Sequence, residues 1–241
     1  DAANTGDTIK VKPGTYDEDL AITTEGLTLE GPNAGTPGDG DRGPEATIKQ
    51  GLEITADGVR IDGVEVTNAD TNGILLGSAP SGVVVTNTVV RDIKGDVGGS
   101  KAAGNGINLQ FTGAFKKTST GIEISNNLIR DISTPDNDGG DADAIGVQLL
   151  PRGNDVENLL IRDNVIADIQ PGTASDGSRS EARAISIDTQ FTDTPGGSRG
   201  DFGQATSLNI SDNEMDNLTA DFARAIALFE DENGDTQGDT N

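Results

Sequence analysis

Apolar and polar residues alternate over four or five positions in six separate stretches of the chain. Alternation with a period of two is typical of a β-strand that buries one face. The six stretches are GLTLEGP from Gly26, GVRIDGVEV from Gly58, GVVVTNTVVRDI from Gly82, GIEISNNLIRDI from Gly121, NLLIRDNVIADI from Asn158 and SLNISDNEMDNL from Ser207. Helical periodicity is sustained nowhere, so the pattern predicts an all-β protein.

A second apolar phrase recurs between these stretches. Its members are NGILL with Ile74, NGINLQF with Ile107, AIGVQLL with Ile145, AISIDTQ with Ile185 and AIALFE with Ile226, at separations of 33, 38, 40 and 41 residues. One repeat therefore contains a strand, a variable loop, a strand, a two-residue polar corner, a strand and another variable loop. This order predicts a right-handed parallel β-helix of about seven rungs, with three short strands in each rung.

Stacking of equivalent strands predicts columns of side chains along the solenoid. The predicted interior columns are Ile107, Ile145, Ile185 and Ile226 on one wall, Ile61, Val85, Ile124, Ile161 and Ile210 on the second, and Ile129 with Ile166 on the third. The polar corners are Thr86-Asn87, Ser125-Asn126-Asn127, Asp163-Asn164 and Asp212-Asn213. Asn and Asp tolerate the left-handed backbone conformation that a sharp bend requires, so we interpret the corners as structural.

Three aspartates, Asp92, Asp131 and Asp168, occupy equivalent places on successive rungs. Two unit charges at the spacing of stacked strands repel each other by roughly 0.9 kcal/mol in water. Either a cation bridges these carboxylates, or each aspartate caps the loop that follows it.

The composition fits a thin, elongated core. The chain has 32% apolar residues, 3% aromatic residues and 33 glycines. We expect one β-helix domain over 1–241, with N-terminal rungs in 1–50 that carry a loop insertion at 32–45, regular rungs in 51–230 and an acidic tail in 231–241. The abrupt start and end suggest a fragment of a longer chain, whose uncapped rungs would stack end to end or continue into further domains.

Negative charge dominates the chain. The 17 basic and 41 acidic residues give a formal charge of −24, which excludes nucleic acid and anionic membranes as favourable partners. The acidic residues are dispersed, and lysine is scarce, as in proteins adapted to high salt, where carboxylate repulsion is screened. The alternative is an acidic surface protein or a calcium binder in ordinary saline. The chain has no cysteine and no apolar run of membrane-spanning length.

The opening rungs carry a resemblance to a known group of proteins. GDTIKVKPGTYDEDLAI followed by GLTLEGPNAG resembles the start of pectinesterase-like and pectate-lyase-like β-helix proteins, particularly secreted proteins of salt-loving archaea. The resemblance implies a parallel β-helix and an extracellular or cell-surface location. It leaves the activity open, because this fold is shared by esterases, lyases, hydrolases, adhesins and viral spikes.

The catalytic motifs of those families are missing from the sequence. Histidine is absent, which excludes a histidine base and a serine-histidine triad. There is also no match to the DFIFG signature of pectinesterases, the Trp-Ile-Asp-His phrase of pectate lyases, or the Asp pair and Gly-His of polygalacturonases. The leading hypothesis is therefore a structural or adhesive solenoid, with a polysaccharide, a cell-surface component or a second copy of the chain as its partner.

The strand after the variable loop would present a polar face. We predict a ligand-binding face made of Asn108, Gln110, Gln148, Ser186 and Asp188. Beside it we expect a ladder of Asn72, Asn105, Asp143, Arg183 and Arg224, with a pair between Asp143 and Arg183. The two sets would suit an acidic sugar, or they would form a solvated ladder of paired charges. If the protein is an enzyme, a lyase or hydrolase acting on an acidic polysaccharide, the catalytic candidates are Asp143, Asp188, Arg183 and Arg224.

Two acidic loops offer oxygen ligands for calcium, which would make the protein a calcium-stabilised binding module. DENGDTQGD places Asp231, Asn233 and Asp235 at alternate positions but has Thr236 where an EF-hand-type loop needs glycine. DNDGGDAD offers Asp136, Asp138, Asp141 and Asp143.

Overall fold

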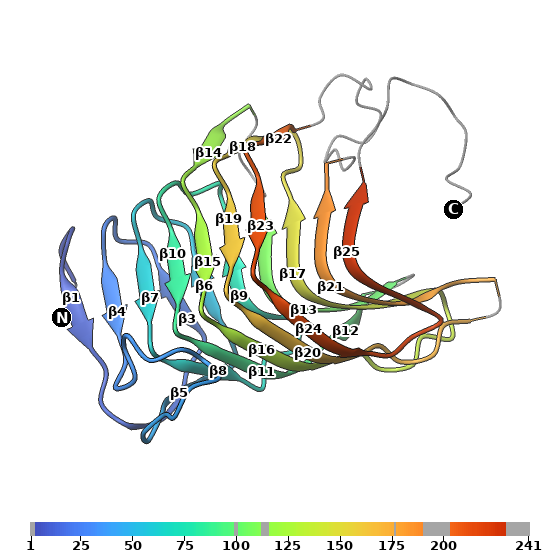
Figure 1. The fold of residues 1–241 in the computed structure, drawn as a ribbon, viewed down its shortest axis with the longest axis horizontal. Coiled ribbons are helices and arrows are strands. Elements are labelled where there is room, and N and C mark those ends of the chain that lie inside the picture. Colours follow the sequence, from blue (N-terminus) through green and yellow to red (C-terminus); the bar gives the residue numbers. More distant parts are fainter. Residues whose placement is uncertain (1–2, 99–100, 112–115, 176, 190–202, 230–241) are drawn as a thin grey trace.

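The chain folds as a right-handed parallel β-helix of seven rungs, as the sequence predicts (Figure 1). The computed structural model describes residues 3–98, 101–111, 116–175, 177–189 and 203–229. Three parallel sheets run along the solenoid, and each rung contributes one strand to each of them in the same order. Within the described residues, no helix has the length and apolar character that a membrane span requires.

The three sheets contain seven main strands each. Sheet 1 consists of β1 (Thr8–Lys10), β4 (Thr28–Glu30), β7 (Arg60–Asp62), β10 (Val84–Thr86), β15 (Glu123–Ser125), β19 (Leu160–Arg162) and β23 (Asn209–Ser211). Sheet 2 consists of β2 (Gly14–Asp17), β5 (Ala46–Lys49), β8 (Glu65–Thr67), β11 (Val89–Lys94), β16 (Leu128–Ser133), β20 (Val165–Gln170) and β24 (Glu214–Leu218). Sheet 3 consists of β3 (Leu20–Ile22), β6 (Leu52–Ile54), β9 (Asn72–Leu76), β13 (Lys101–Gln110), β17 (Asp141–Leu150), β21 (Ser180–Asp188) and β25 (Phe222–Phe229).

Short strands add to this frame in the later rungs. β12 (Asp96–Gly98) pairs antiparallel with β13. β14 (Thr118–Thr120), β18 (Asp155–Glu157) and β22 (Ala205–Thr206) form a small fourth sheet in the loops that lead back to sheet 1.

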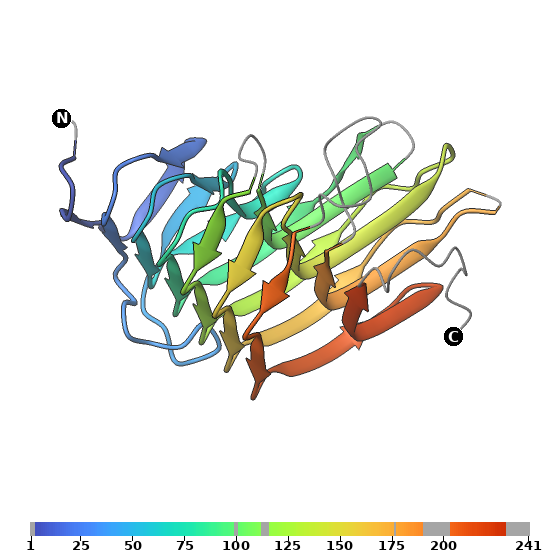
Figure 2. The same cartoon turned by 90° about the horizontal axis from the view of Figure 1, so that it is seen from above.

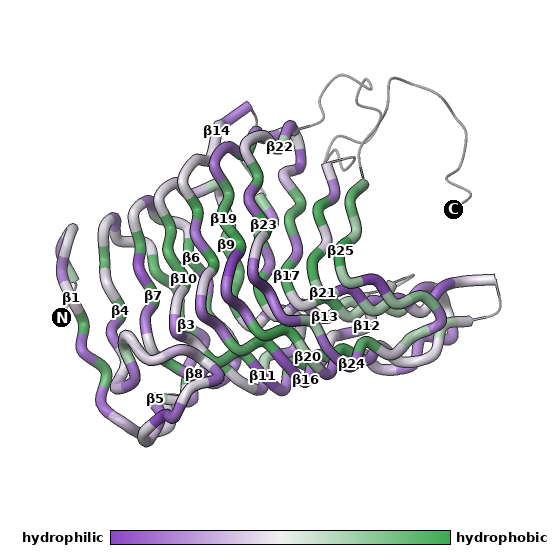
Figure 3. The backbone as a smooth tube through the Cα atoms, viewed as in Figure 1, coloured by the Kyte–Doolittle hydropathy of each residue, from purple (hydrophilic) through white to green (hydrophobic). Residues whose placement is uncertain are grey.

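The core is a column of aliphatic side chains between the three sheets. Apolar positions recur on successive strands along the whole solenoid (Figure 3). Ile61, Val85, Ile124 and Ile161 are in register and fully buried, and Ile129 and Ile166 are likewise stacked and buried. Ile210 continues the first of these columns and is partly buried. The predicted second and third walls are therefore confirmed.

The predicted first wall is wrong by two residues at one rung. Ile107 is in register with Val147, and Val147 with Ile185, whereas Ile145 pairs with Asn105 and Arg183. The strand bends at Gly146, between these two residues, so Val147 packs in the core whereas Ile145 belongs to the outward column of Asn105 and Arg183. Ile226 has the predicted register with Ile185 but is 43% exposed, because no described strand stacks beyond β25.

The polar corners are structural, as interpreted from the sequence. Asn87, Asn126, Asp163 and Asp212 all have φ between 52° and 56°, the left-handed region that Asn and Asp tolerate. The next residue on each of the later rungs is an asparagine that points inward. The Asn127 Nδ2 donates to Asn164 Oδ1 at 3.0 Å, and the Asn164 Nδ2 donates to Asn213 Oδ1 at 2.9 Å. This ladder satisfies amide groups that would otherwise be buried without partners.

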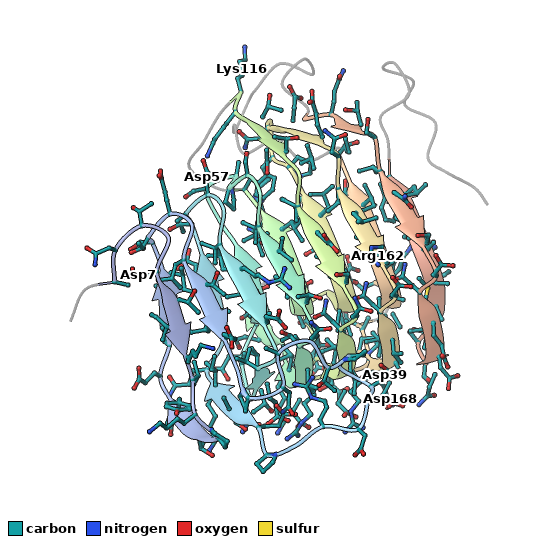
Figure 4. The ribbon with its side chains drawn as sticks, turned by 60° about the vertical axis from the view of Figure 1, so that its left-hand side comes forward. Asp7, Asp39, Asp57, Lys116, Arg162 and Asp168 are labelled. Atoms are coloured by element: carbon teal, nitrogen blue, oxygen red, sulfur yellow. The ribbon has the colours of Figure 1, made fainter. Side chains whose placement is uncertain are left out.

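A long loop, residues 31–45, joins β4 to β5 and lies across the corners of later rungs. The Arg42 guanidinium donates to both carboxylate oxygens of Glu45, at 2.6 and 3.1 Å, and to the carbonyl oxygen of Asn87 at 2.7 Å. The Gly38 N–H donates to the Asn126 carbonyl at 2.8 Å. Asp39 of this loop lies at the same lower edge of the molecule as Asp168 (Figure 4). The loop therefore connects the second rung directly to the fourth and fifth.

Candidate functional site

The last four long strands of sheet 3 bend sharply, and they lie side by side along the solenoid (Figures 1 and 2). Small residues occupy the bend on its core side. A Cβ atom on Gly106 would lie 2.5 Å from Ile129 Cγ2, and one on Gly146 would lie 2.5 Å from Ile166 Cγ2. The bend therefore depends on glycine, because sheet 2 packs directly against its backbone.

We name the outward side of this bend the elbow; it is formed by Asn72 together with residues 103–110, 143–150, 181–188 and 222–229. Contacts cross the bend from one arm to the other. Arg183 and Arg224 stand over the ring of Phe229, with guanidinium carbons 5.2 and 5.9 Å from its centroid. Asn72 Oδ1 accepts hydrogen bonds from the Asn105 Nδ2 at 3.1 Å and the Asn108 Nδ2 at 2.8 Å.

One arm of the elbow carries a cluster of ion pairs. Arg183 Nη1 lies 3.6 Å from Asp143 Oδ2, so the predicted pair is present. Arg183 also pairs with Glu181, and Arg224 Nη1 lies 3.2 Å from the same Glu181 Oε2. Arg179 adds a longer contact of 3.8 Å to Glu181 Oε1. Glu181 is therefore shared by arginines from two rungs.

The register corrects the predicted ladder. Asn72, Asn105, Arg183 and Arg224 do align, but the residue between Asn105 and Arg183 is Ile145. Asp143 stands two residues earlier, in register with Glu181. The sequence interpretation missed Glu181 for this reason, since the same two-residue shift that misplaced Ile145 put Asp143 beside Arg183. Aligning Gly146 with Ala184, the small residue at the same place on the next rung, would have revealed the pair of acids.

The structure places three of the five residues of the predicted ligand-binding face side by side. Asn108, Gln148 and Ser186 are in register on neighbouring strands. Gln110 lies two residues further along β13 and accepts a hydrogen bond from the Asn108 Nδ2 at 3.2 Å. Asp188 lies at the end of β21, in register with Phe229.

Several buried polar atoms of the elbow have no hydrogen-bond partner. They are Asn105 Oδ1, Asn108 Oδ1, Arg183 Nε and Ser186 Oγ. Ser186 is 0% exposed and Asn108 is 1% exposed, so bulk water does not compensate them. A buried polar group without a partner costs about 1–3 kcal/mol. Buried polar atoms of this kind are satisfied by an ordered water or by a ligand.

The calcium candidate in residues 136–143 is divided between a loop and the elbow. Asp136 accepts hydrogen bonds from the Thr173 N–H and hydroxyl, both at 2.8 Å, and these bonds lower the pKa of Asp136 below its usual value. Asp141 Oδ1 accepts from the Arg179 N–H at 2.9 Å, whereas Asp143 belongs to the elbow. Asp138 is exposed. These bonds join neighbouring rungs, and calcium binding at this loop stays a prediction.

The other calcium candidate lies outside the described residues, as does the whole acidic tail; it consists of Asp231, Asn233 and Asp235. Within the described ranges, no group of three or more His, Cys, Asp or Glu side chains is placed to hold a metal ion.

The three stacked aspartates are bend residues of sheet 2. Asp92, Asp131 and Asp168 each have φ of 55°, and each interrupts the pairing of a long strand between two stretches of ladder. They line an open hollow of about 390 Å³ together with Asn217. Because left-handed backbone favours Asp and Asn, their residue type follows from the bend.

Comparisons with known proteins find one solved structure of similar fold and assign the chain to no family. No family model matches the chain, and no curated protein matches it. Among solved structures, the chain is similar to the crystal structure of a pectin methylesterase from Aspergillus niger, with 13% sequence identity and a TM-score of 0.38. That alignment covers 98% of this chain and 79% of the esterase. At this level the similarity concerns the fold alone.

Proposed function

We propose that the protein is an extracellular or cell-surface β-helix that binds a polysaccharide at the elbow. The observation that carries this proposal is the group of buried, unpaired polar atoms of Asn105, Asn108, Arg183 and Ser186. Amide, hydroxyl and guanidinium groups are those that recognise sugar hydroxyls by hydrogen bonding. The side chains stand on strands rather than loops, so their positions are set before a ligand arrives.

An adhesive role fits this site better than turnover. Both carboxylates of the cluster, Asp143 and Glu181, are ion-paired with arginine. A ligand held by such a ladder would make contacts spread along several rungs, as expected of a solenoid that attaches to a polymer.

Binding of oligosaccharides to the chain and to a Ser186→Ala variant tests the proposal. Ser186 Oγ has no partner in the structure, so we expect the variant to fold normally and to bind about three- to tenfold more weakly, the value of one hydrogen bond. Isothermal titration calorimetry measures the affinity. The matched control is Ser125→Ala, which removes a buried serine from sheet 1 and is expected to leave binding unchanged. Equal affinity of Ser186→Ala and the parent chain would reject the elbow as the site.

A second candidate function is a lyase or hydrolase activity on the bound polysaccharide. The observation in its favour is the register of Asp143 with Glu181, which places two carboxylates on adjacent rungs beside Arg183. Incubation with polyuronates and neutral polysaccharides in high salt, followed by assays for reducing ends and unsaturated products, distinguishes the two functions. Turnover that is abolished by Glu181→Gln would replace the adhesive proposal with an enzymatic one.

A further inference from the structure

We infer that the elbow takes a neutral, hydroxyl-rich saccharide and selects against acidic sugars, with Glu181 as the residue that determines this specificity. The inference rests on the proposed function and names the chemical class of its ligand. It departs from the expectation, drawn from the two arginines, of an acidic sugar.

The first argument is the hydrogen-bonding character of the unpaired atoms. Asn105 Oδ1 and Asn108 Oδ1 can only accept, Ser186 Oγ can donate or accept, and Arg183 Nε can only donate. A ligand that satisfies them must offer donors to the two amide oxygens and an acceptor to the arginine. A sugar hydroxyl does both. An ionised carboxylate offers acceptors only, so it would face the two amide oxygens with like partial charge.

The second argument is that the arginines of the elbow already have anionic partners. Glu181 is paired with Arg183 and Arg224, and Asp143 is paired with Arg183. The elbow holds two arginines, Arg183 and Arg224, against three acids, Asp143, Glu181 and Asp188, so its formal charge is already −1. A ligand carboxylate would enter as an unbalanced charge.

The magnitude of this penalty follows from the distances. A ligand carboxylate that contacts Arg224 would stand close to Glu181, whose Oε2 lies 3.2 Å from the Arg224 Nη1. Two like charges 4 Å apart repel by about 4 kcal/mol at the effective dielectric near a protein surface. At low ionic strength the overall charge of −24 adds a repulsive field toward polyanions, which 1 M salt screens. A neutral sugar pays neither cost.

Glu181 therefore occupies the position beside Arg183 and Arg224 that the carboxylate of an acidic sugar would otherwise take. Glu181→Gln retains the shape of the side chain, removes the anionic partner of Arg224 and leaves Arg183 with Asp143 alone. We expect this substitution to raise the affinity for acidic oligosaccharides at least fivefold and to change the affinity for neutral ones by less than threefold.

Matched oligosaccharide pairs test the inference. Galactohexaose is compared with hexagalacturonate, and mannohexaose with hexamannuronate, by calorimetry in 1 M KCl. We expect the parent chain to bind at least one neutral hexasaccharide at least tenfold more tightly than its acidic counterpart. Methyl-esterified hexagalacturonate, in which the charge is removed, is expected to bind more tightly than the free acid, which provides a test that needs no protein variant.

The control variant is Glu123→Gln in β15 of sheet 1, where Glu123 pairs with Arg162 at 3.0 Å, whereas the elbow belongs to sheet 3. It is expected to leave every affinity unchanged. Tighter binding of the free uronates than of the neutral sugars by the parent chain would overturn the inference and leave the polysaccharide proposal standing. Absence of binding to all probes, or binding that Ser186→Ala leaves unchanged, would instead overturn the proposed function.

Discussion

At the scale of single residues, Asp62 connects three parts of the structure. Its Oδ1 accepts from the Asn87 Nδ2 at 2.8 Å and from the Gly35 N–H at 3.0 Å, and its Oδ2 pairs with Arg60 at 2.7 Å. Burial by itself raises the pKa of Asp62, but the hydrogen bonds from Asn87, Gly35 and Arg60 together outweigh it, so the pKa is lowered. One carboxylate thus links a corner, the long loop and a strand of sheet 1.

This lowered pKa predicts a dependence of stability on pH. Because the folded-state pKa of Asp62 lies below the unfolded value of about 3.9, its contribution to stability is present above that pH and is lost as the pH falls through the folded pKa. We expect Asp62→Asn to lower the free energy of unfolding at pH 7 by about 1–3 kcal/mol. Urea unfolding from pH 7 to pH 3 should show the difference between the two proteins shrinking at the acidic end. A constant difference would contradict this role of Asp62.

At the scale of elements, the bend in sheet 3 places the two arms of the elbow face to face. The bend requires small residues, because the side chains of Ile129 and Ile166 pack against Gly106 and Gly146. The site therefore depends on contacts made on the opposite, core-facing side of the same strands.

Gly146→Ala tests this dependence. The added Cβ would lie 2.5 Å from Ile166 Cγ2 and 2.6 Å from the Ala184 carbonyl oxygen, and overpacking of this kind costs about 1–3 kcal/mol. We expect a lower melting temperature together with weaker saccharide binding. Gly77→Ala is the control, because its nearest neighbour is the flexible carboxylate of Glu53 at 3.2 Å. If Gly146→Ala and Gly77→Ala melt alike, the bend does not need glycine.

The elements themselves could be predicted from the sequence, and their detailed register could not. Alternation at Ile61, Val85, Ile124 and Ile161 indicated strands, repeat length and buried columns, because stacking in a β-helix repeats each environment. The position of Asp143 was misjudged because β17 bends at Gly146, so that Ile145 and Val147 belong to different columns. The ion pairs of Glu181 depend on that register and on the bend in sheet 3. Glycine is the only sign of this bend in the sequence, so the elbow could not be predicted without the structure.

At the scale of the whole molecule, surface charge is the dominant feature. The formal charge of −24 is distributed along the entire solenoid, and some carboxylates are paired, as with Arg60 and Asp62 or Arg162 and Glu123. Because the 41 acidic residues outnumber the 17 basic ones, most carboxylates have no basic side chain to pair with. The folded state therefore carries net electrostatic self-repulsion. This excess of charge is the reason for the prediction, made from the composition, that the protein is adapted to high salt.

Salt should therefore stabilise the folded chain. The Debye length falls from about 10 Å at 0.1 M to about 3 Å at 1 M ionic strength, which screens repulsion between exposed carboxylates. We expect the melting temperature to rise steadily with KCl between these concentrations. Sucrose at equal osmolarity serves as the uncharged control. A melting temperature that is insensitive to KCl would argue against a halophilic protein.

The loop of residues 31–45 changes how the solenoid can unfold. In a regular solenoid each repeat contacts only its neighbours, so stability is a sum of local terms and the ends fray independently. Arg42 and Gly38 bind the carbonyl groups of Asn87 and Asn126, which belong to rungs two and three further along. Those long-range bonds couple the second rung to the fourth and fifth, so we expect these rungs to unfold together. Within the described residues, the last two rungs, which carry Arg183, Ser186 and Arg224, lack such long-range bonds, so we expect them to open first. The proposed binding surface would then lie at the boundary between a stable block and a more labile end.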